Sequence, residues 1–231
     1  MKCVICRKKL IKKQKRFCSY KCYWKSLLNP KKLDLNRWKK WSPIFCYFLG
    51  IIASDGHIDI KRNTIGITSI DKETIKKFQK FVGNPLYVYQ YNNAYRITLC
   101  NKQIIEILNK KGFSKPKFQR ALPFIPKKYL KYFILGYFDG DGNANWAKKS
   151  CNKTVTIDSG NKEFIKSLSL LITKNYNIKN SVHELKNGSF YRLQFTNVPA
   201  RALYKLMYDN KSIEFCLSRK HIKLKEMFSD D

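Results

Sequence analysis

The chain has 231 residues, 44% of them hydrophobic, so it can bury a core in one large domain or two smaller ones and is not disordered throughout. Its 47 Lys and Arg against 16 Asp and Glu give a formal net charge of +31. This charge favours nucleic acid as the partner over an anionic membrane, because no basic amphipathic anchor is present. No membrane-length apolar run and no signal peptide are visible. We therefore expect an intracellular protein (cytoplasm, nucleoid or organelle matrix) with reduced cysteines and no membrane partner.

Four of the eight cysteines form two close pairs near the N-terminus. Cys3 and Cys6 make up the first pair, Cys18 and Cys22 the second, and a basic loop separates them. Thiolates at these spacings can bind one tetrahedral zinc, and a segment this small needs a metal for its stability. Four unrelated buried cysteines are the alternative interpretation. The spacing predicts a zinc site formed by all four thiolates.

The N-terminal region is also strongly basic. Up to Lys40 it holds 15 Lys and Arg and a single acid, Asp34. We predict a zinc-binding module over residues 1–28, with Ser19 capping a short helix, and a basic linker over 29–41 that lies on phosphates. A module that binds only another protein would not need this charge.

Two apolar runs, 86 residues apart, are each predicted to form a buried helix. Ser42-Pro43 fits the N-cap and first turn of the first helix, and Pro126 is similarly placed ahead of the second. Gly50 and Gly136 each lie four residues before a second small residue on one helical face. Small residues at that spacing let two helix backbones approach closely. We therefore predict that Gly50 and Gly136 lie at the interface of the two helices.

Both apolar runs end in a small residue, a carboxylate and a glycine. Pairing the helices through their glycines places Asp55 and Asp141 side by side at the helix C-terminal ends. The two carboxylates repel each other, and the helix dipole is negative at the same end, so a cation is needed there. Oxygen ligands and this charge favour Mg²⁺, or Mn²⁺ as a similar ion. The sequence thus predicts a divalent metal site at Asp55 and Asp141.

The same order of elements follows each of these helices: a hairpin, a helix, a second hairpin and a last helix. In the first half, hairpins over 57–69 and 86–99 alternate with helices over 72–81 and 103–110, and the second half repeats the scheme. The expected fold class is α+β. It consists of tandem αββαββα repeats over 42–125 and 126–231, related by pseudo-twofold symmetry. Two antiparallel sheets would form a saddle, with the small zinc module at the N-terminus.

Predicted turns fix which side chains share a sheet face. A two-residue turn at Arg62-Asn63 pairs Ile60 with Ile65, one at Asn92-Asn93 puts Tyr89 opposite Arg96, and one at Asn187-Gly188 puts His183 opposite Arg192. Polar faces beside a metal-binding acid pair indicate hydrolysis of a nucleic-acid backbone. The residues that we expect to contact DNA are Asp59, Lys61, Arg62, Thr64, Thr68, Tyr87, Tyr89, Arg96 and Thr98 in the first half, and Lys153, Thr154, Thr156, His183, Arg192 and Gln194 in the second.

The two apolar runs resemble the paired signatures of the LAGLIDADG homing endonucleases, in the single-chain, two-repeat form. The resemblance rests on residues 48–56 and 134–142, and extends over about Ser42 to Lys220 through the repeated order of elements. The first copy departs from the signature at Ala53, where the signature has an acid. Ala53 is not the metal-binding position. The family resemblance implies a nuclease of a mobile genetic element, active in intron homing.

The resemblance also implies roles for individual residues. Asp55 and Asp141 would bind Mg²⁺ or Mn²⁺, assisted by the backbone carbonyls of Ser54 and Gly140. Basic residues near the scissile phosphates would assist catalysis, and ordinary phosphate contacts are the alternative role for them. The candidates are Lys117 or Arg120 before the second signature, and Lys220 near the C-terminus.

Three functions remain open at this point. The first is a monomeric, sequence-specific endonuclease that cuts both strands of double-stranded DNA, with the zinc module extending the DNA contact. The second is a maturase that binds intron RNA on the same scaffold. The third is a DNA-binding regulator without catalysis, which the presence of both Asp55 and Asp141 disfavours.

Overall fold

The structure is a computed structural model, and the residues described are 1–11, 16–27, 33–83, 86, 88–147, 151–185, 188–209 and 212–229. The first half consists of α3 (Pro43–Asp55), β1 (Gly56–Asp59), β2 (Thr64–Ser69), α4 (Lys72–Val82), β3 (Val88–Tyr91), β4 (Ala94–Cys100) and α5 (Lys102–Lys110). The second half consists of α6 (Lys127–Asp141), β5 (Gly142–Ala147), β6 (Asn152–Ser159), α7 (Lys162–Tyr176), β7 (Ser181–Leu185), β8 (Phe190–Thr196) and α8 (Val198–Met207). The predicted fold class, α+β with tandem αββαββα repeats, is confirmed.

Further elements lie outside the repeats. They are α1 (Tyr20–Leu27), α2 (Asn36–Lys39), the 3-10 turns η1 (Lys117–Gln119) and η3 (Ser212–Glu214), and α9 (Ser218–Met227). Trp38 of α2 is fully buried and packs against Phe81 and Phe45, which attaches the segment after the N-terminal module to the first half. No helix in the described part of the chain is both long and apolar enough to cross a membrane.

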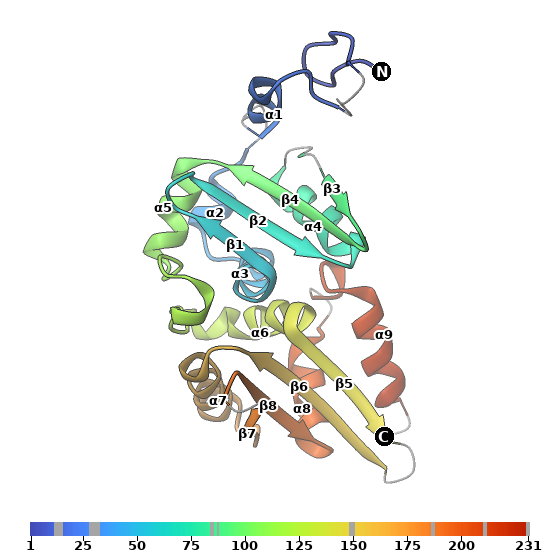
Figure 1. Ribbon diagram of the computed structural model, residues 1–231. Helices are drawn as coiled ribbons and strands as arrows, with labels where there is room; N and C mark the ends of the chain where they lie inside the picture. Colours follow the sequence, from blue (N-terminus) through green and yellow to red (C-terminus); the bar gives the residue numbers. More distant parts are fainter. Residues whose placement is uncertain are drawn as a thin grey trace.

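Helices α3 and α6 form the centre of the molecule and separate the two sheets (Figure 1). The Ser42 side chain accepts a hydrogen bond from the Phe45 amide at 3.3 Å, which caps the start of α3. Gly50 and Gly136 lie where the two helices cross. A Cβ atom on Gly50 would overlap the backbone of α6, and one on Gly136 would overlap the Tyr47 carbonyl. Only glycine permits this approach.

Each half has a four-stranded antiparallel sheet, ordered β1-β2-β4-β3 in the first half and β5-β6-β8-β7 in the second. Ile65, Ile67 and Ile97 on the inner face of the first sheet are buried in the core, as are Val155 and Leu193 in the second. The alternate side chains lie on the opposite, outer face. Each sheet thus has an apolar inner face and a polar outer face.

One predicted register is wrong. In the first hairpin Ile58 pairs with Ile65 and Asp59 with Thr64, so four residues, 60–63, form the turn instead of two. Asp59 Oδ1 accepts a hydrogen bond from the Arg62 amide at 3.0 Å, and Asn63 takes a positive φ of 52°. This local turn is closed by a side chain, which the two-residue turn did not allow for. The shift is by two residues, so each side chain keeps its predicted face.

The other two registers are as predicted. Tyr89 lies opposite Arg96, and His183 lies opposite Arg192. Asn187 of the last turn and Tyr87 of the second hairpin lie outside the described residues.

Candidate active site and nucleic-acid face

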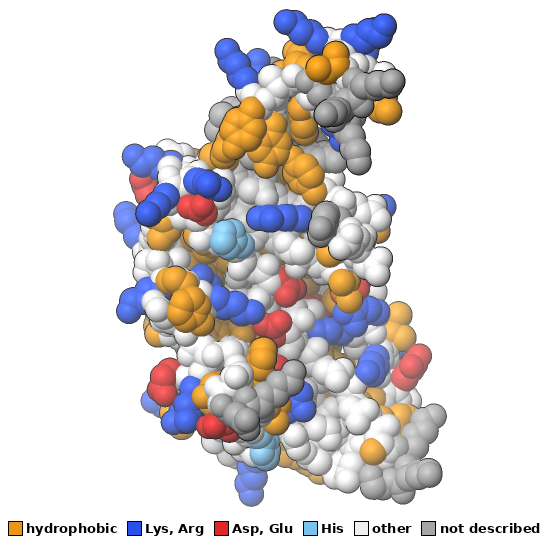
Figure 2. All heavy atoms as spheres, viewed as in Figure 1, with side chains coloured by type: hydrophobic (Ala, Val, Ile, Leu, Met, Phe, Trp, Pro, Cys, Tyr) orange, Lys and Arg blue, Asp and Glu red, His pale blue; other side chains and the backbone are white. Residues whose placement is uncertain are grey.

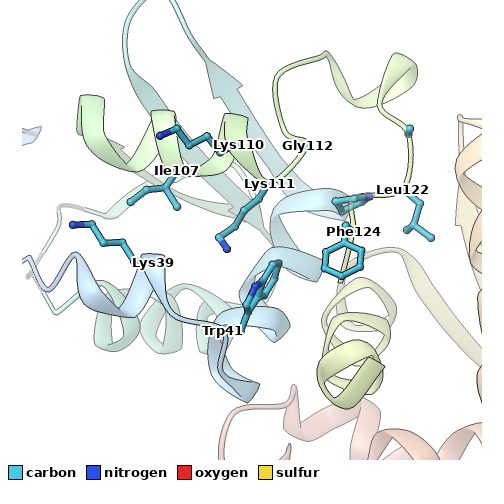
Figure 3. Close-up of a pocket in the computed structure, with 10 residues that line it drawn as sticks. Lys39, Trp41, Ile107, Lys110, Lys111, Gly112, Leu122 and Phe124 are labelled. Atoms are coloured by element: carbon cyan, nitrogen blue, oxygen red, sulfur yellow. The ribbon is translucent and has the colours of Figure 1, made fainter. Parts of the chain in front are cut away.

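Asp55 and Asp141 are the last residues of α3 and α6. Between them Gly140 packs on Ser54 so closely that a Cβ there would overlap the serine hydroxyl and lie 3.1 Å from Asp55 Oδ2. Burial, and then the negative charge of Asp141, raises the pKa of Asp55 to about 6. The helix pair therefore brings both acids to one place, as the sequence suggested, and the site attracts positive charge. Figure 2 shows acidic side chains in the middle of this face, between the two halves.

Lys117 supplies a positive charge between the two helix ends. Its Nζ lies 2.8 Å from Asp141 Oδ2 and also donates to the backbone carbonyl of Ser54. The ammonium thus bridges a carboxylate of one helix and the terminal carbonyl of the other. Oxygens placed to hold an ammonium also suit a hard cation, so these donors fit Mg²⁺ or Mn²⁺.

Lys220, on α9, occupies the corresponding position at the end of α6. Its Nζ donates to the carbonyls of Phe138 and Gly142, both at 2.6 Å, with Gly140 at 3.5 Å. Burial of the side chain lowers the pKa of Lys220 to about 8. Its charge offsets the negative C-terminal end of the helix.

Arg120 has a different position from Lys117. Its Nε and Nη2 donate to the Lys115 carbonyl at 3.2 and 3.1 Å, and the guanidinium lies over the Phe113 ring at 4.7 Å. The residue is only 5% exposed. Of the two alternatives, Lys117 is the one that contacts the acid pair. Arg120 shapes the segment that carries it.

Asp139 is a site residue to which the sequence analysis gave no role. It is buried in α6 and accepts hydrogen bonds from the Tyr47 hydroxyl at 2.9 Å and the Leu217 amide at 2.7 Å. Burial raises the pKa of Asp139 to about 7. Because Leu217 precedes α9, this acid fixes the helix that carries Lys220. A signal for Asp139 was present in the sequence: it is the signature acid of the second run, at the position where the first run has Ala53.

Each lysine segment is held by the other half of the chain, which the sequence analysis also missed. Asn161, which caps α7, donates from Nδ2 to the Arg120 carbonyl at 2.8 Å. Asp71, at the start of α4, forms a two-bond ion pair of 2.7 and 2.8 Å with Arg219, the neighbour of Lys220. The positions of Lys117 and Lys220 therefore depend on correct docking of the two halves.

The outer face of the first sheet carries most of the side chains expected to contact DNA. Thr68 and Arg96 are exposed and lie opposite each other, and Tyr89 flanks Arg96 on the next strand. Asp59 and Arg62 form a loose ion pair of 3.7 Å at the turn. Lys61 is exposed in the same turn, Thr98 is half-buried, and Thr64 is buried.

The second sheet presents a comparable face, with one correction. Thr156 lies opposite Gln194, and Thr154, two residues before it in β6, is on the same face. Arg192 is bound to Asp158 by hydrogen bonds of 2.8 and 2.7 Å, so its guanidinium is held in place beside His183. The odd-numbered positions of β6 face inward, and Lys153 is one of them.

Lys153 is therefore on the opposite face from Thr154 and Thr156. Its Nζ lies over the rings of Trp146 and Phe228, at 5.3 and 5.6 Å. Strand alternation puts Lys153 on the inner face of the second sheet, away from the face predicted to contact DNA.

The four N-terminal cysteines come together as one cluster. The Sγ atoms of Cys3, Cys6, Cys18 and Cys22 all lie within 4.8 Å of one another, with Cys6 and Cys18 at 3.2 Å. Thiolates bound to one zinc at about 2.3 Å would be roughly 3.8 Å apart, so the cluster fits a tetrahedral metal. Ser19 accepts from the Cys22 amide at 3.2 Å and starts α1, as predicted.

Comparison with known proteins identifies the class. Residues 128–219 match the family model of the LAGLIDADG-like domain, which covers α6 through the start of α9. Residues 128–219 are thus similar to the LAGLIDADG-like domain and include the second of the two predicted signatures, and the first half of the chain repeats the same order of elements.

Solved structures share the fold of both halves. The homing endonuclease I-WcaI bound to its DNA recognition sequence gives a TM-score of 0.60 at 17% identity, over 85% of this chain and 94% of that one. I-DmoI in complex with DNA and Mn gives 0.53 at 16% identity, over 73% and 98%. Full-length WhiA from Thermatoga maritima gives 0.53 at 14% identity, over 79% and 60%. At these identities the likeness is one of fold.

Curated relatives are much longer proteins. A probable translation initiation factor IF-2 of Methanocaldococcus jannaschii is 29% identical over 207 residues, which is 78% of this chain and 17% of that protein. The RNA polymerase subunit Rpo1C of the same organism is 26% identical over 215 residues, 89% and 22% respectively. Its reverse gyrase is 25% identical over 201 residues, 84% and 11%. The chain thus spans less than a quarter of the length of each of these relatives.

Proposed function

We propose that this protein is a sequence-specific endonuclease that hydrolyses both strands of double-stranded DNA with divalent metal ions. One observation carries the proposal: Asp55 and Asp141 end two glycine-packed helices, with the Lys117 ammonium already bridging the site. Acids placed so closely are costly for the fold and useful for binding a metal. The polar outer faces of the two sheets lie on either side.

The site residues suit hydrolysis of a phosphodiester. A bound Mg²⁺ or Mn²⁺ would polarise the phosphate and acidify water, and it would be held by Asp55, Asp141 and the carbonyls of Ser54 and Gly140. Lys117, released from Asp141, can then move to a non-bridging phosphate oxygen and offset its growing charge. In the reaction water gives up a proton as its oxygen bonds to phosphorus, the bond from phosphorus to the sugar oxygen breaks, and the sugar oxygen takes up a proton. Lys220 continues to offset the negative end of α6.

The two sheets would hold the DNA on either side of the cut. A net charge of +31 supplies the affinity for phosphates, and the polar outer faces reach base edges in the flanking major grooves. Because both halves belong to one chain, a monomer can form the whole site. The proposed DNA surface comprises Asp59, Lys61, Arg62, Thr64, Thr68, Tyr89, Arg96, Thr98, Thr154, Thr156, His183, Arg192 and Gln194; Lys153 is left out because of its position.

We further propose that Cys3, Cys6, Cys18 and Cys22 bind zinc. The support is the convergence of the four Sγ atoms within 4.8 Å in a module with little core of its own. Metal analysis of a Cys18→Ser/Cys22→Ser double variant tests this site. Zinc content equal to that of the unaltered protein would refute it.

The relatives favour the interpretation that the shared stretch is a mobile module and does not perform the activities given in their names. An initiation factor, an RNA polymerase subunit and a reverse gyrase share no single function, yet each matches most of this chain over a small part of its own length. We infer that the shared stretch is inserted into these proteins and carries an independent function. Site-specific DNA cleavage is a function that would account for such insertion.

The decisive experiment combines target selection with two variants. The protein is incubated with Mg²⁺ and a library of DNA targets, and the assay is repeated with Asp55→Asn, Asp141→Asn and the control Glu106→Gln, an exposed acid of α5. Loss of cutting in the first two variants, with binding kept, supports the proposal.

Other outcomes decide between the alternatives. Cutting that survives Asp141→Asn would exclude a shared site. Binding of duplex DNA without any cutting would identify a regulator, and selective binding of intron RNA would identify a maturase.

A further inference from the structure

A cleft separates helix α1 of the N-terminal module from the outer face of the first sheet. It has a volume of about 390 Å³. Tyr20, Tyr23 and Trp24 of α1 form one wall, and the opposite wall includes Arg62 and Arg96. Figure 2 shows hydrophobic side chains gathered below the module at the upper end of the first sheet. The cleft is thus continuous with the proposed DNA face.

Contacts near its start hold helix α1 in this position. Cys22 belongs to the cysteine cluster, and the Ser19 cap starts the helix ahead of it. The Tyr23 ring lies 6.1 Å from the ring of Tyr89 on β3, which joins the module to the sheet. A metal in the cysteine cluster would therefore order the aromatic wall as well.

The aromatic wall is partly exposed, with Tyr23 and Trp24 half-buried and Tyr20 exposed. Tyr20 is 71% exposed, and its ring meets that of Trp24 edge to face at 5.6 Å. Exposed aromatic clusters that serve no core are typical of binding surfaces. Arginines across the cleft and a strongly basic module indicate a polyanion as the occupant.

We propose that α1 adds an aromatic wall to the outer face of the first sheet and so extends the DNA contact of the first half along the duplex. Tyr20 and Trp24 would pack against sugars and exposed base edges, while Arg62 contacts phosphate. Within the residues that the structure describes, Cys3, Cys6, Cys18 and Cys22 form the one cluster of this kind. The contact therefore falls on one flank of the DNA and makes recognition asymmetric. This inference rests on the proposed function, because it deepens the same DNA surface.

Footprinting on a duplex that extends well past the selected target on both sides tests the site. The test variant is Tyr20→Ala/Trp24→Ala, and the matched control is Phe124→Ala, an aromatic side chain that is 79% exposed ahead of α6. We expect the double variant to bind on the order of tenfold more weakly, as for loss of aromatic contacts to nucleic acid. Protection should be lost at one end of the footprint only.

Two further measurements make the outcome unambiguous. Unchanged zinc content of the double variant shows that the module is intact, and a Cys6→Ser/Cys18→Ser variant should lose the same flank. A footprint identical to that of the unaltered protein overturns the inference and leaves the endonuclease proposal standing. If the unaltered protein and Phe124→Ala neither bind nor cut any target, the proposed function fails and the inference fails with it.

Discussion

Lys117 Nζ lies 2.8 Å from Asp141 Oδ2, so a lysine between α5 and α6 neutralises the acid that ends α6. The same ammonium donates a hydrogen bond to the Ser54 carbonyl near the end of α3. Lys220 makes the matching contacts with the carbonyls at the end of α6. The two lysines differ in burial, since Lys117 is 41% exposed and Lys220 only 6%. We expect them to respond differently to substitution.

Lys117→Met should abolish most cleavage and leave the fold intact. The exposed ion pair contributes at most about 1 kcal/mol to folding, because solvent screens it. Removal of a cation that meets the phosphate should lower the cleavage rate on the order of a hundredfold. Single-turnover cleavage and urea unfolding measure the two effects.

Lys115→Met is the control for this variant. It removes the same charge from the same exposed segment, whose backbone is held through the Lys115 carbonyl rather than the side chain. Equal loss of cleavage in both variants would show that general loss of charge, and not the Asp141 contact, is responsible.

Binding of Mg²⁺ should strengthen as pH rises through about 6. Burial raises the pKa of Asp55 to that value, so at lower pH the carboxyl is protonated and the cation must displace the proton. Affinity should increase by up to about tenfold per pH unit below pH 6 and level off above it. The free energy of unfolding depends on pH in the opposite direction. The stabilising effect of the raised pKa is fully present below about pH 4 and is lost as pH rises through about 6.

Calorimetric titration of zinc-saturated protein with Mg²⁺ at several pH values checks this. Asp55→Asn should bind weakly and with little dependence on pH over the same range. A cation affinity of the unaltered protein that does not change between pH 5 and pH 7 would contradict the assignment.

Asn161→Asp should weaken the site from a distance. The aspartate keeps the oxygen that accepts the Phe164 amide at 3.1 Å, so the cap of α7 survives. It loses the Nδ2 donor to the Arg120 carbonyl, and the carboxylate repels that oxygen. The free energy of unfolding should fall by about 1–3 kcal/mol. Cleavage should fall too, because the segment carrying Lys117 loses its anchor.

Asn101→Asp provides the comparison. Asn101 caps α5 through the Ile104 amide at 3.0 Å, in the same way as Asn161 caps α7. Its substitution should change stability by less than about 0.5 kcal/mol and leave cleavage unaltered. A similar loss in both variants would assign the effect to the caps alone.

The local features of the fold were predictable because they depend on neighbouring residues. Ser42 and its proline begin α3, alternation sets the strands, and the glycines mark the helix contact. The first hairpin turn was not predictable, because the Asp59 side chain closes a four-residue turn. Its register error left each face unchanged, so the DNA face could still be predicted.

The missed parts of the site depend on contacts between residues far apart in the sequence. Asn161 with the Arg120 carbonyl and Asp71 with Arg219 join the two halves, and no local pattern distinguishes them from ordinary helix starts. The position of Lys153 could have been predicted, since strict alternation from Thr154 already places it on the inner face.

Gly136→Ala should both move Asp141 away from Asp55 and destabilise the protein. The added methyl would overlap the Tyr47 carbonyl of α3, and this backbone oxygen can move only with its helix. Overpacking of a tight interior costs about 1–3 kcal/mol, and a shift of the helix axes moves Asp141 away from Asp55. Thermal unfolding and Mg²⁺ binding should therefore both weaken.

Gly160→Ala is the matched control, because its added methyl would meet only the Ser189 carbonyl, at 3.8 Å. Stability there should stay the same or rise slightly, since alanine restricts the unfolded chain. If Gly136→Ala lowers stability but leaves Mg²⁺ affinity and cleavage at the unaltered level, the spacing of the helices does not set the geometry of the acid pair. If both properties fall only in Gly136→Ala, the helix contact positions the catalytic carboxylates.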